Sequence, residues 1–401
     1  MSTALYVKPN MLVYRCAQGA CFVLAAFVFK RRFIRNEIKG VDDAYVVVAN
    51  HQCSLDFVNL IGATRKPLTF VLSNSFCNSL PISGLIKRLG VIPKQQFQTS
   101  VSDMKKMKAV IDSGASLVIY PAGLMCEDGV STPIPEATYK FLKWLDADIY
   151  AARTTGTYFS KPKWTGGIRS GRTYLDVYRL LSKAEAQAMK VSEIRDVVEA
   201  ALLFNAYEDQ EKLLIKYKDC DNIQGLENVL YRCPNCHKEF TVGVHDRSTI
   251  RCSACGYEES CDEFGFLHNY KGMGPEIRHV PDWSRRIFDE LKQHIKDNPD
   301  FTMSAPTKIH MIDYQKHKFT EVGHGTVSLC SDRFTLTGKL NGESFSREFS
   351  TAKFPTLPFS PGKFFEIQDG NDIYRCVLED GRLAMKFINA LKAFFELMHN
   401  R

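Results

Sequence analysis

Residues 45–56 of this chain have the sequence YVVVANHQCSLD, a short apolar run that ends in Asn50-His51 and is followed by Asp56. The run from Tyr45 to Ala49 is rich in β-branched valine and predicts a buried β-strand. His51 is then expected at the exit of this strand, and Asp56 on the turn or helix beyond it. This placement can bring the two side chains together.

The two side chains have the chemistry of a general base and its partner. A carboxylate on one imidazole nitrogen fixes the tautomer and stabilises the cation that forms when the other nitrogen takes a proton from an alcohol. The alcohol can then attack an acyl thioester in one step, without a serine or cysteine nucleophile. The alternative is that His51 merely ends a strand and Asp56 merely caps a helix, since this spacing often occurs by chance.

On both sides of this motif, from Val41 to about residue 200, strand-like runs alternate with helix-like segments. Two further strand-like runs are residues 68–72 (LTFVL) and 116–120 (SLVIY). Short apolar β-branched runs separated by helical stretches predict an α/β domain with a mostly buried sheet. Residues 190–219, rich in Glu, Ala, Leu and Lys, are predicted to be helical and to lead out of this domain.

The region from about residue 40 to 160 resembles the glycerolipid acyltransferase family, which includes bacterial 1-acylglycerol-3-phosphate acyltransferases. The Asn-His-Gln-x-Ser-x-Asp form beginning at Asn50 is similar to the first family block, and residues 80–93 (LPISGLIKRLGVIP) are similar to the second. The resemblance implies an αβ fold in which His51 is the general base and Asp56 orients it. It also implies that acyl-CoA or acyl carrier protein donates the fatty chain.

The third block departs from the family, in which a Phe-Pro-Glu-Gly-Thr-Arg segment is associated with binding glycerol phosphate. Here residues 120–125 are YPAGLM, so Pro121 and Gly123 match while Ala122 and Met125 stand where the family has glutamate and arginine. The resemblance therefore implies Pro121 and Gly123, together with Asn50, as substrate-binding residues. It leaves the identity of the acceptor open.

Four cations are candidates for binding an acceptor phosphate. Charge-assisted hydrogen bonds would suit Lys87, Arg88 and Lys94, in or beside the second block, although solvated surface residues are the commoner alternative. Arg153, in the strand-like run from Ile149, could supply a cation from a neighbouring strand, and a structural role is the alternative.

Residues 11–29 (MLVYRCAQGACFVLAAFVF) predict an apolar helix about as long as the ~30 Å hydrocarbon core of a bilayer. The interior Arg15 would cost about 2.5 kcal/mol or more at the bilayer centre, so we expect the helix to lie in the interface with Arg15 at the headgroups. The alternative is a first helix packed on its own domain.

Anionic lipid would attract the basic cluster that follows, Lys30, Arg31, Arg32 and Arg35. The expected location is the cytoplasmic face of a membrane, peripheral or monotopic.

Cys233-Pro-Asn-Cys236 and Cys252-Ser-Ala-Cys255 form two Cys-x-x-Cys pairs separated by fifteen residues. This spacing lets four thiolates surround one tetrahedral Zn²⁺, and a closed four-sulfur shell leaves no position for a reactive water. The pattern predicts a zinc ribbon with a structural metal. The acidic residues of the ribbon balance its basic ones, so no nucleic-acid partner is expected.

Residues 305–380 show alternating polar and apolar strands, and residues 382–398 carry apolar side chains at helical spacing. This pattern predicts a small antiparallel β-sandwich closed by a C-terminal helix. In strand pattern and closing helix it resembles domains of the pleckstrin-homology or GRAM kind, which bind lipids or proteins.

With 401 residues, 45% hydrophobic and 24% charged, the chain is expected to be folded and multidomain, not extended disorder or a multi-span transporter. We expect residues 1–40 to be a membrane-associating helix and basic cluster, 41–220 an acyltransferase-like domain, 221–300 a zinc ribbon and helical linker, and 301–401 a β domain.

The predicted function is transfer of a fatty acyl group to the hydroxyl of a lysophospholipid, 1-acylglycerol-3-phosphate or a related acceptor, in phospholipid synthesis. The alternative is a catalytically silent zinc-ribbon adaptor or regulator on an acyltransferase-like, lipid-binding scaffold.

Overall fold

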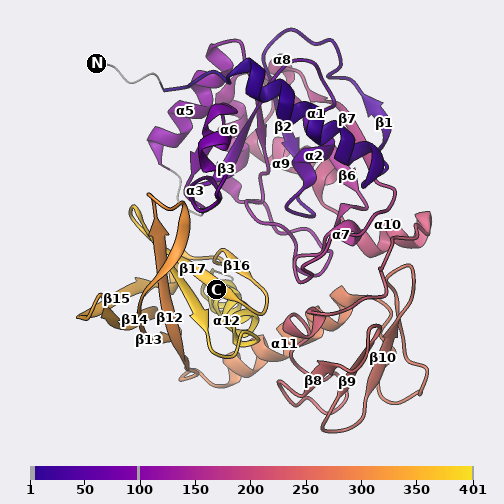
Figure 1. Ribbon diagram of the computed structural model, residues 1–401, viewed down its shortest axis with the longest axis vertical. Helices are drawn as coiled ribbons and strands as arrows, with labels where there is room; N and C mark the ends of the chain where they lie inside the picture. Colours follow the sequence, from indigo (N-terminus) through magenta and orange to yellow (C-terminus); the bar gives the residue numbers. More distant parts are fainter. Residues whose placement is uncertain (1–4, 97–99, 400–401) are drawn as a thin grey trace. The chain divides into compact units, whose positions relative to one another are not determined.

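The computed structural model describes residues 5–96 and 100–399, and Figure 1 shows its helices and strands. The chain forms two compact units. The first consists of residues 1–162 and 167–219, and the second of residues 163–166 and 220–401. The four-part division expected from the sequence stays a prediction.

A seven-stranded sheet organises the first unit, and the strand that precedes His51 lies at its centre. Five strands run parallel to one another, while β7 pairs antiparallel with β6 and parallel with β1. The order across the sheet is β1 (Arg32–Asn36), β7 (Tyr174–Leu181), β6 (Asp148–Thr155), β2 (Tyr45–Ala49), β5 (Ser116–Ile119), β3 (Leu68–Ser73) and β4 (Ile92–Lys94).

Both faces of this sheet are covered, which explains why every residue of β2 is buried. Val46 and Val48 belong to a hydrophobic core with residues of α5 (Val101–Asp112), α6 (Glu136–Leu145) and α9 (Val191–Leu202). Tyr45, Val47 and Ala49 point to the other face and pack with residues of α1 (Met11–Phe27) and α2 (Asp56–Ile61). Alternate strand residues thus serve two cores, as expected of a strand covered on both faces. The predicted α/β layer structure is present.

The remaining helices of this unit are short and connect the layers. They are α3 (Asn74–Asn78), α4 (Ser83–Arg88), α7 (Thr157–Ser160), α8 (Lys183–Ala188) and α10 (Ala206–Leu213). The predicted helical region 190–219 is occupied by α9 and α10.

The first helix, α1, has apolar side chains on two sides. Tyr14, Cys21 and Ala25 are buried against the unit's own core. On the outside, Leu12 and Phe27 are 77% and 74% exposed. Of the helices in the described residues, none has the length and apolarity needed to cross a membrane. The Arg15 guanidinium donates to the side chain of Gln18 and the backbone oxygen of Arg65, so contacts of its own unit hold it.

Within the second unit, residues 242–268 form a four-stranded antiparallel sheet next to a long amphipathic helix. The order is β11 (Leu267–His268), β10 (Glu258–Cys261), β9 (Thr249–Cys252) and β8 (Val242–Val244). The helix α11 (Val280–Asp297) begins with Pro281 in its first turn, where the missing N–H costs no helical hydrogen bond. A short 3-10 helix, η1 (Leu226–Asn228), precedes the sheet.

The C-terminal part is a seven-stranded antiparallel sheet that carries the helix α12 (Leu383–His399). Phe334 of β14, Phe365 of β17 and Phe387 of α12 form an aromatic cluster with ring centroids 5.5–6.1 Å apart. The antiparallel strands and closing helix expected from the sequence are therefore present, whereas a β-sandwich of pleckstrin-homology or GRAM type stays a prediction. The strand order is β15 (Glu343–Ser350), β14 (Arg333–Leu340), β13 (Lys318–Leu329), β12 (Met303–Asp313), β18 (Asp372–Leu378), β17 (Phe364–Asp369) and β16 (Phe359–Ser360), with η2 (Thr351–Lys353) between β15 and β16.

Polar contacts join the cysteine-rich sheet to the C-terminal helix inside this second unit. The ammonium of Lys386 lies 2.6 Å from a carboxylate oxygen of Glu239. Arg382 donates to the backbone oxygen of Phe240 at 2.8 Å. The two parts therefore pack as one body.

Candidate active site

His51 and Asp56 meet at the carboxyl edge of the parallel strands. β2 ends at Ala49, so His51 follows the strand directly, and Asp56 opens α2. The imidazole Nδ1 of His51 lies 2.9 Å from Oδ2 of Asp56. The predicted pairing is therefore present, although its catalytic role stays a prediction.

Asp56 is held by three strong donors besides the imidazole. Its Oδ2 accepts the backbone N–H groups of Gln52 (2.7 Å) and Cys53 (2.9 Å), and its Oδ1 accepts the hydroxyl of Thr157 at 2.6 Å. The carboxylate is 1% exposed, so these donors replace the water that it has lost. A buried acceptor fixed in this way orients the imidazole and stabilises a proton on it.

The ring of Tyr120 stacks on the imidazole of His51, with ring centroids 4.3 Å apart and planes 27° from parallel. Burial raises the pKa of the Tyr120 phenol well above its usual value, so the hydroxyl stays neutral. That hydroxyl is buried and has no hydrogen-bond partner among the residues that the structure describes. Tyr120 therefore supports the imidazole by packing alone.

Gln52 and Thr157 complete the support behind the carboxylate. The Gln52 side chain is buried, and its Oε1 accepts the backbone N–H of Tyr158 at 3.0 Å and lies 3.1 Å from the Thr157 hydroxyl. That hydroxyl has one proton, and its contact with Asp56 is the shorter of its two. Neither Thr157 nor Tyr120 is predicted from the sequence. They follow β6 and β5, the two strands next to β2.

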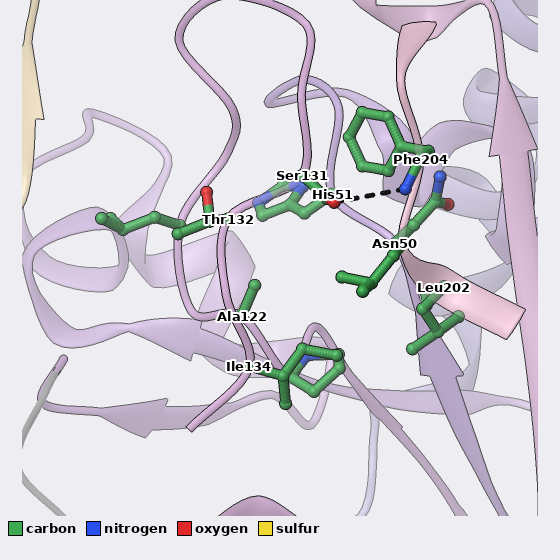
Figure 2. Close-up of a pocket in the computed structure, with 12 residues that line it drawn as sticks. Asn50, His51, Ala122, Ser131, Thr132, Ile134, Leu202 and Phe204 are labelled. Atoms are coloured by element: carbon green, nitrogen blue, oxygen red, sulfur yellow. Dashed lines mark hydrogen bonds between the residues drawn. The ribbon is translucent and has the colours of Figure 1, made fainter. Parts of the chain in front are cut away.

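His51 lines a small hollow of about 260 Å³, its open mouth included (Figure 2). Asp56 occupies Nδ1 and leaves Nε2 as the nitrogen available to a bound molecule. Because part of this volume is the open mouth, the space suits the reacting groups of a substrate and not a whole lipid. The walls come from residues 49–51, 121, 122, 124, 131, 132, 134 and 202–204.

Asn50 and Pro121 line this hollow, and Gly123 stands in the chain between two lining residues, Ala122 and Leu124. Both amide atoms of Asn50 bind the backbone of Thr154 on β6, each at 2.8 Å, so Asn50 joins the ends of two strands. Pro121 lines the hollow. Gly123 has φ +73°, a conformation that favours glycine, and its N–H donates to the backbone oxygen of Tyr120. Binding of substrate by these three residues stays a prediction.

Arg153 lies beside the hollow, in contact with its wall. The guanidinium donates to the backbone oxygen of Leu203 at 3.1 Å and forms an ion pair of 3.2 Å with Asp209. Leu203 lines the hollow. These contacts give Arg153 a structural role in holding the segment after α9, and acceptor binding by it stays a prediction.

The other three predicted cations lie farther from the dyad. Lys87 and Arg88 occupy the last turn of α4, which leads into the edge strand β4, and in the described residues neither makes a hydrogen bond with His51 or Asp56. Lys94 ends β4, three strands away from β2, which corresponds to about 14 Å at the usual spacing of strands. The structure does not bring these cations together with the dyad.

The four cysteines of the second unit do come together. Their sulfurs lie within 4.8 Å of one another, and the Cys233–Cys255 and Cys236–Cys252 pairs are each 3.7 Å apart. Four sulfurs at about 2.3 Å from a tetrahedral Zn²⁺ would be about 3.8 Å apart, so the arrangement is compatible with zinc.

The two Cys-x-x-Cys turns that hold these sulfurs have the same backbone geometry. In each, the residue after the second cysteine has positive φ and donates its N–H to the first cysteine's oxygen at 3.0 Å: His237 to Cys233 and Gly256 to Cys252. The ring of His237 faces Glu290. Turns of this form point two thiolates toward one centre.

Comparison with known proteins assigns a domain family to part of the first unit. The family model described as Acyltransferase matches residues 30–154, less than a third of the chain. No curated protein matches the sequence. The fold, the His–Asp pair at the sheet edge and this match together define an acyltransferase domain. This agrees with the acyltransferase domain that the sequence resemblance implied for about residues 40 to 160.

Among solved structures, the chain is similar to the 1-acyl-sn-glycerophosphate (LPA) acyltransferase PlsC from Thermotoga maritima, with 15% identity over 51% of this chain and 79% of that chain and a TM-score of 0.41. It is also similar to the Ran-binding domain of Nup2 from Ashbya gossypii, with 15% identity over 24% of this chain, 99% of that chain and a TM-score of 0.19. A structure of the Vav1 exchange factor with its PH and C1 domains gives 11% identity over 30% and 39% of the two chains and a TM-score of 0.19. Scores this low carry no argument about substrates or partners.

Proposed function

We propose that this protein transfers a fatty acyl group from a thioester to the hydroxyl of a lipid alcohol, with His51 as the general base. The observation that carries the proposal is the 2.9 Å contact between His51 Nδ1 and the buried Asp56 carboxylate, beside a hollow that His51 lines. The acyltransferase domain over residues 30–154 supports acyl transfer in lipid synthesis.

In this reaction the acceptor hydroxyl gives its proton to Nε2 of His51 while its oxygen attacks the thioester carbonyl carbon. Asp56 stabilises the imidazolium that forms. The tetrahedral intermediate then expels the thiolate by breaking the carbon–sulfur bond, and the imidazolium returns the proton to the sulfur. The products are an ester and a free thiol.

The donor is acyl-CoA or acyl carrier protein, and the acceptor is a monoacylated glycerolipid. The acceptor that the sequence predicts is a lysophospholipid, 1-acylglycerol-3-phosphate or a related alcohol. Phospholipid synthesis is the process in which such a reaction would serve.

The experiment that tests the proposal compares the parent with His51→Ala. Labelled oleoyl-CoA or oleoyl-acyl carrier protein is incubated with 1-oleoylglycerol or its 3-phosphate, and ester formation is measured. His51 is the single histidine among residues 1–219, so the matched control is the exposed His324→Ala in the second unit. We expect turnover to fall at least a hundredfold for His51→Ala only. Absent turnover in the parent with every donor and acceptor would favour the silent adaptor instead.

We also propose a structural Zn²⁺ bound by Cys233, Cys236, Cys252 and Cys255. The tetrahedral spacing of the sulfurs supports it, and the metal would supply folding free energy to the surrounding strands. No step of the reaction passes through these residues.

A third proposal is peripheral binding to the cytoplasmic face of a membrane through the outside of α1. Leu12, Phe22 and Phe27 are exposed there, and the exposed Phe33 and Ile34 of β1 follow the helix. Apolar side chains next to a basic cluster suit an anionic lipid surface. Replacing Leu12 and Phe27 by glutamate should abolish cosedimentation with vesicles that contain phosphatidylglycerol, while the exposed Tyr314→Glu should have no effect.

A further inference from the structure

The lining of the hollow at His51 is mostly apolar. Of its twelve lining residues none is Lys, Arg, Asp or Glu. Eight are apolar: Ala49, Pro121, Ala122, Leu124, Ile134, Leu202, Leu203 and Phe204. A molecule whose hydroxyl reaches Nε2 therefore enters mostly hydrocarbon surroundings.

Two of the three polar neighbours of His51 in this lining are already bound to the protein. Both amide atoms of Asn50 bind Thr154. The hydroxyl of Ser131 accepts the N–H of Phe204 at 3.2 Å. Thr132 makes no side-chain hydrogen bond within the described part of the chain, so its hydroxyl can receive a substrate, and the Ser131 hydroxyl still has its own proton to donate (Figure 2). Neutral hydroxyls suit an uncharged hydroxyl or ester group.

Arg153 and Lys94, two of the cations expected to bind an acceptor, do not correct this lack of positive charge. Arg153 is paired with Asp209, and Lys94 lies about three strand spacings away from β2. The charge nearest to the imidazole is the carboxylate of Asp56, at 2.9 Å. A phosphate on the carbon next to the reacting hydroxyl would therefore lose water, gain no cation and lie near a buried anion, which is unfavourable.

We infer that the acceptor carries no phosphate or other anionic group beside the hydroxyl that reacts, and that it is a neutral lipid alcohol of the monoacylglycerol type. This inference rests on the proposed acyl transfer and names its substrate class. The uncharged lining favours an uncharged acceptor. The apolar walls contact its glycerol backbone and ester, Thr132 hydrogen-bonds one neutral oxygen, and His51 accepts the proton of the reacting hydroxyl. A charged headgroup is disfavoured because its desolvation is not compensated.

The test measures competition between two acceptors that differ only in the phosphate. The full chain is assayed in mixed micelles with oleoyl-CoA and oleoyl-acyl carrier protein, with 1-oleoylglycerol and 1-oleoylglycerol 3-phosphate at equal surface concentration. We expect kcat/KM to be at least about tenfold higher for the neutral acceptor. An equal or higher value for the phosphorylated acceptor overturns the inference and leaves acyl transfer intact. Absence of His51-dependent turnover with both acceptors overturns the proposed function as well.

Two variants that each add a lysine to the lining test whether its lack of charge sets the choice of acceptor. Their readout is a change in the preference between the two acceptors, not a loss of activity. Thr132→Lys places a cation in the lining, and we expect it to raise the ratio of kcat/KM for the phosphorylated over the neutral acceptor by about tenfold. Ala122→Lys provides a second position if the first variant folds poorly. The control Ala137→Lys adds the same charge at an exposed site on α6 and should leave the ratio unchanged. An unchanged ratio in both lining variants, with turnover retained, contradicts the inference.

Discussion

The hydroxyl of Thr157 donates a 2.6 Å hydrogen bond to Oδ1 of Asp56, the carboxylate oxygen that His51 does not contact. The two residues lie 101 positions apart in the sequence and meet because β6 and β2 are neighbours. Both carboxylate oxygens are therefore bound: Oδ1 by the Thr157 hydroxyl beyond β6, and Oδ2 by the imidazole and the backbone N–H groups beyond β2. Thr157 thus positions Asp56, and Asp56 positions His51, while His51 alone accepts the proton.

Thr157→Val should lower kcat about tenfold or more with little change in KM, because a hydrogen bond to a buried charged group contributes about 1.5–3 kcal/mol. The measurement is steady-state turnover of labelled acyl thioester. Thr157→Ser keeps the donor and should restore at least a third of the parental rate. Equal rates for the valine and serine variants would show that the hydroxyl does not position Asp56.

Tyr120→Phe should keep catalysis and raise stability. The stacked ring is retained, while the buried hydroxyl without a partner in the described residues is removed, which we expect to stabilise the first unit by about 1 kcal/mol. Tyr120→Leu removes the stacking surface and should lower kcat. Denaturant unfolding and turnover of the two variants separate the effects, and a destabilised Phe variant would reveal a partner for the hydroxyl.

The local parts of the site could be predicted from the sequence, and the parts that depend on strand order could not. His51 and Asp56 are close in the chain, so one strand end and one helix start suffice to pair them. Tyr120 and Thr157 reach His51 and Asp56 only because β5 and β6 flank β2, an order that no residue pattern specifies.

The cations expected to bind an acceptor likewise show that the sequence does not predict contacts between distant parts of the chain. Arg153 was expected on a neighbouring strand, and β6 is indeed next to β2, but its guanidinium binds Leu203 and Asp209. A charge in a sequence shows neither its partner nor its distance across a sheet. The cysteines differ, because their spacing in short turns nearly determines the geometry of the cluster.

Removal of the metal should unfold the second unit selectively. The purified protein is expected to contain one zinc per chain, and a chelator should lower its Tm because bound metal adds its binding free energy to folding. Cys236→Ser should abolish zinc binding. The control is Cys330→Ser, whose side chain donates to Asp332 and lies outside the cluster. Full zinc content in Cys236→Ser would rule out the four-sulfur site.

Glu259 predicts a pH dependence of stability in the same unit. Its side chain is fully buried, its Oε1 accepts the hydroxyl of Tyr257, and its Oε2 has no partner in the part of the chain that the structure describes. Burial raises the pKa of this carboxyl from 4.5 to about 7. The hydrogen bonds from Tyr257 and from the backbone of Ile277 and the nearby His268 oppose the rise, and Glu276 adds to it. The folded state therefore holds a proton that the unfolded state has already lost.

Because the folded protein binds more protons between pH 4.5 and 7, its free energy of unfolding falls as pH rises through this window and is constant above it. Glu259→Gln removes the titration, so we expect it to be more stable than the parent by about 2 kcal/mol at pH 8, after allowance for screening by polar neighbours, and equal to it near pH 4.5. The four-cysteine cluster is the same in both proteins, so its titration cancels in the difference. Denaturant unfolding at several pH values checks this, and a difference that does not change with pH would mean that Glu259 is ionised in the folded state.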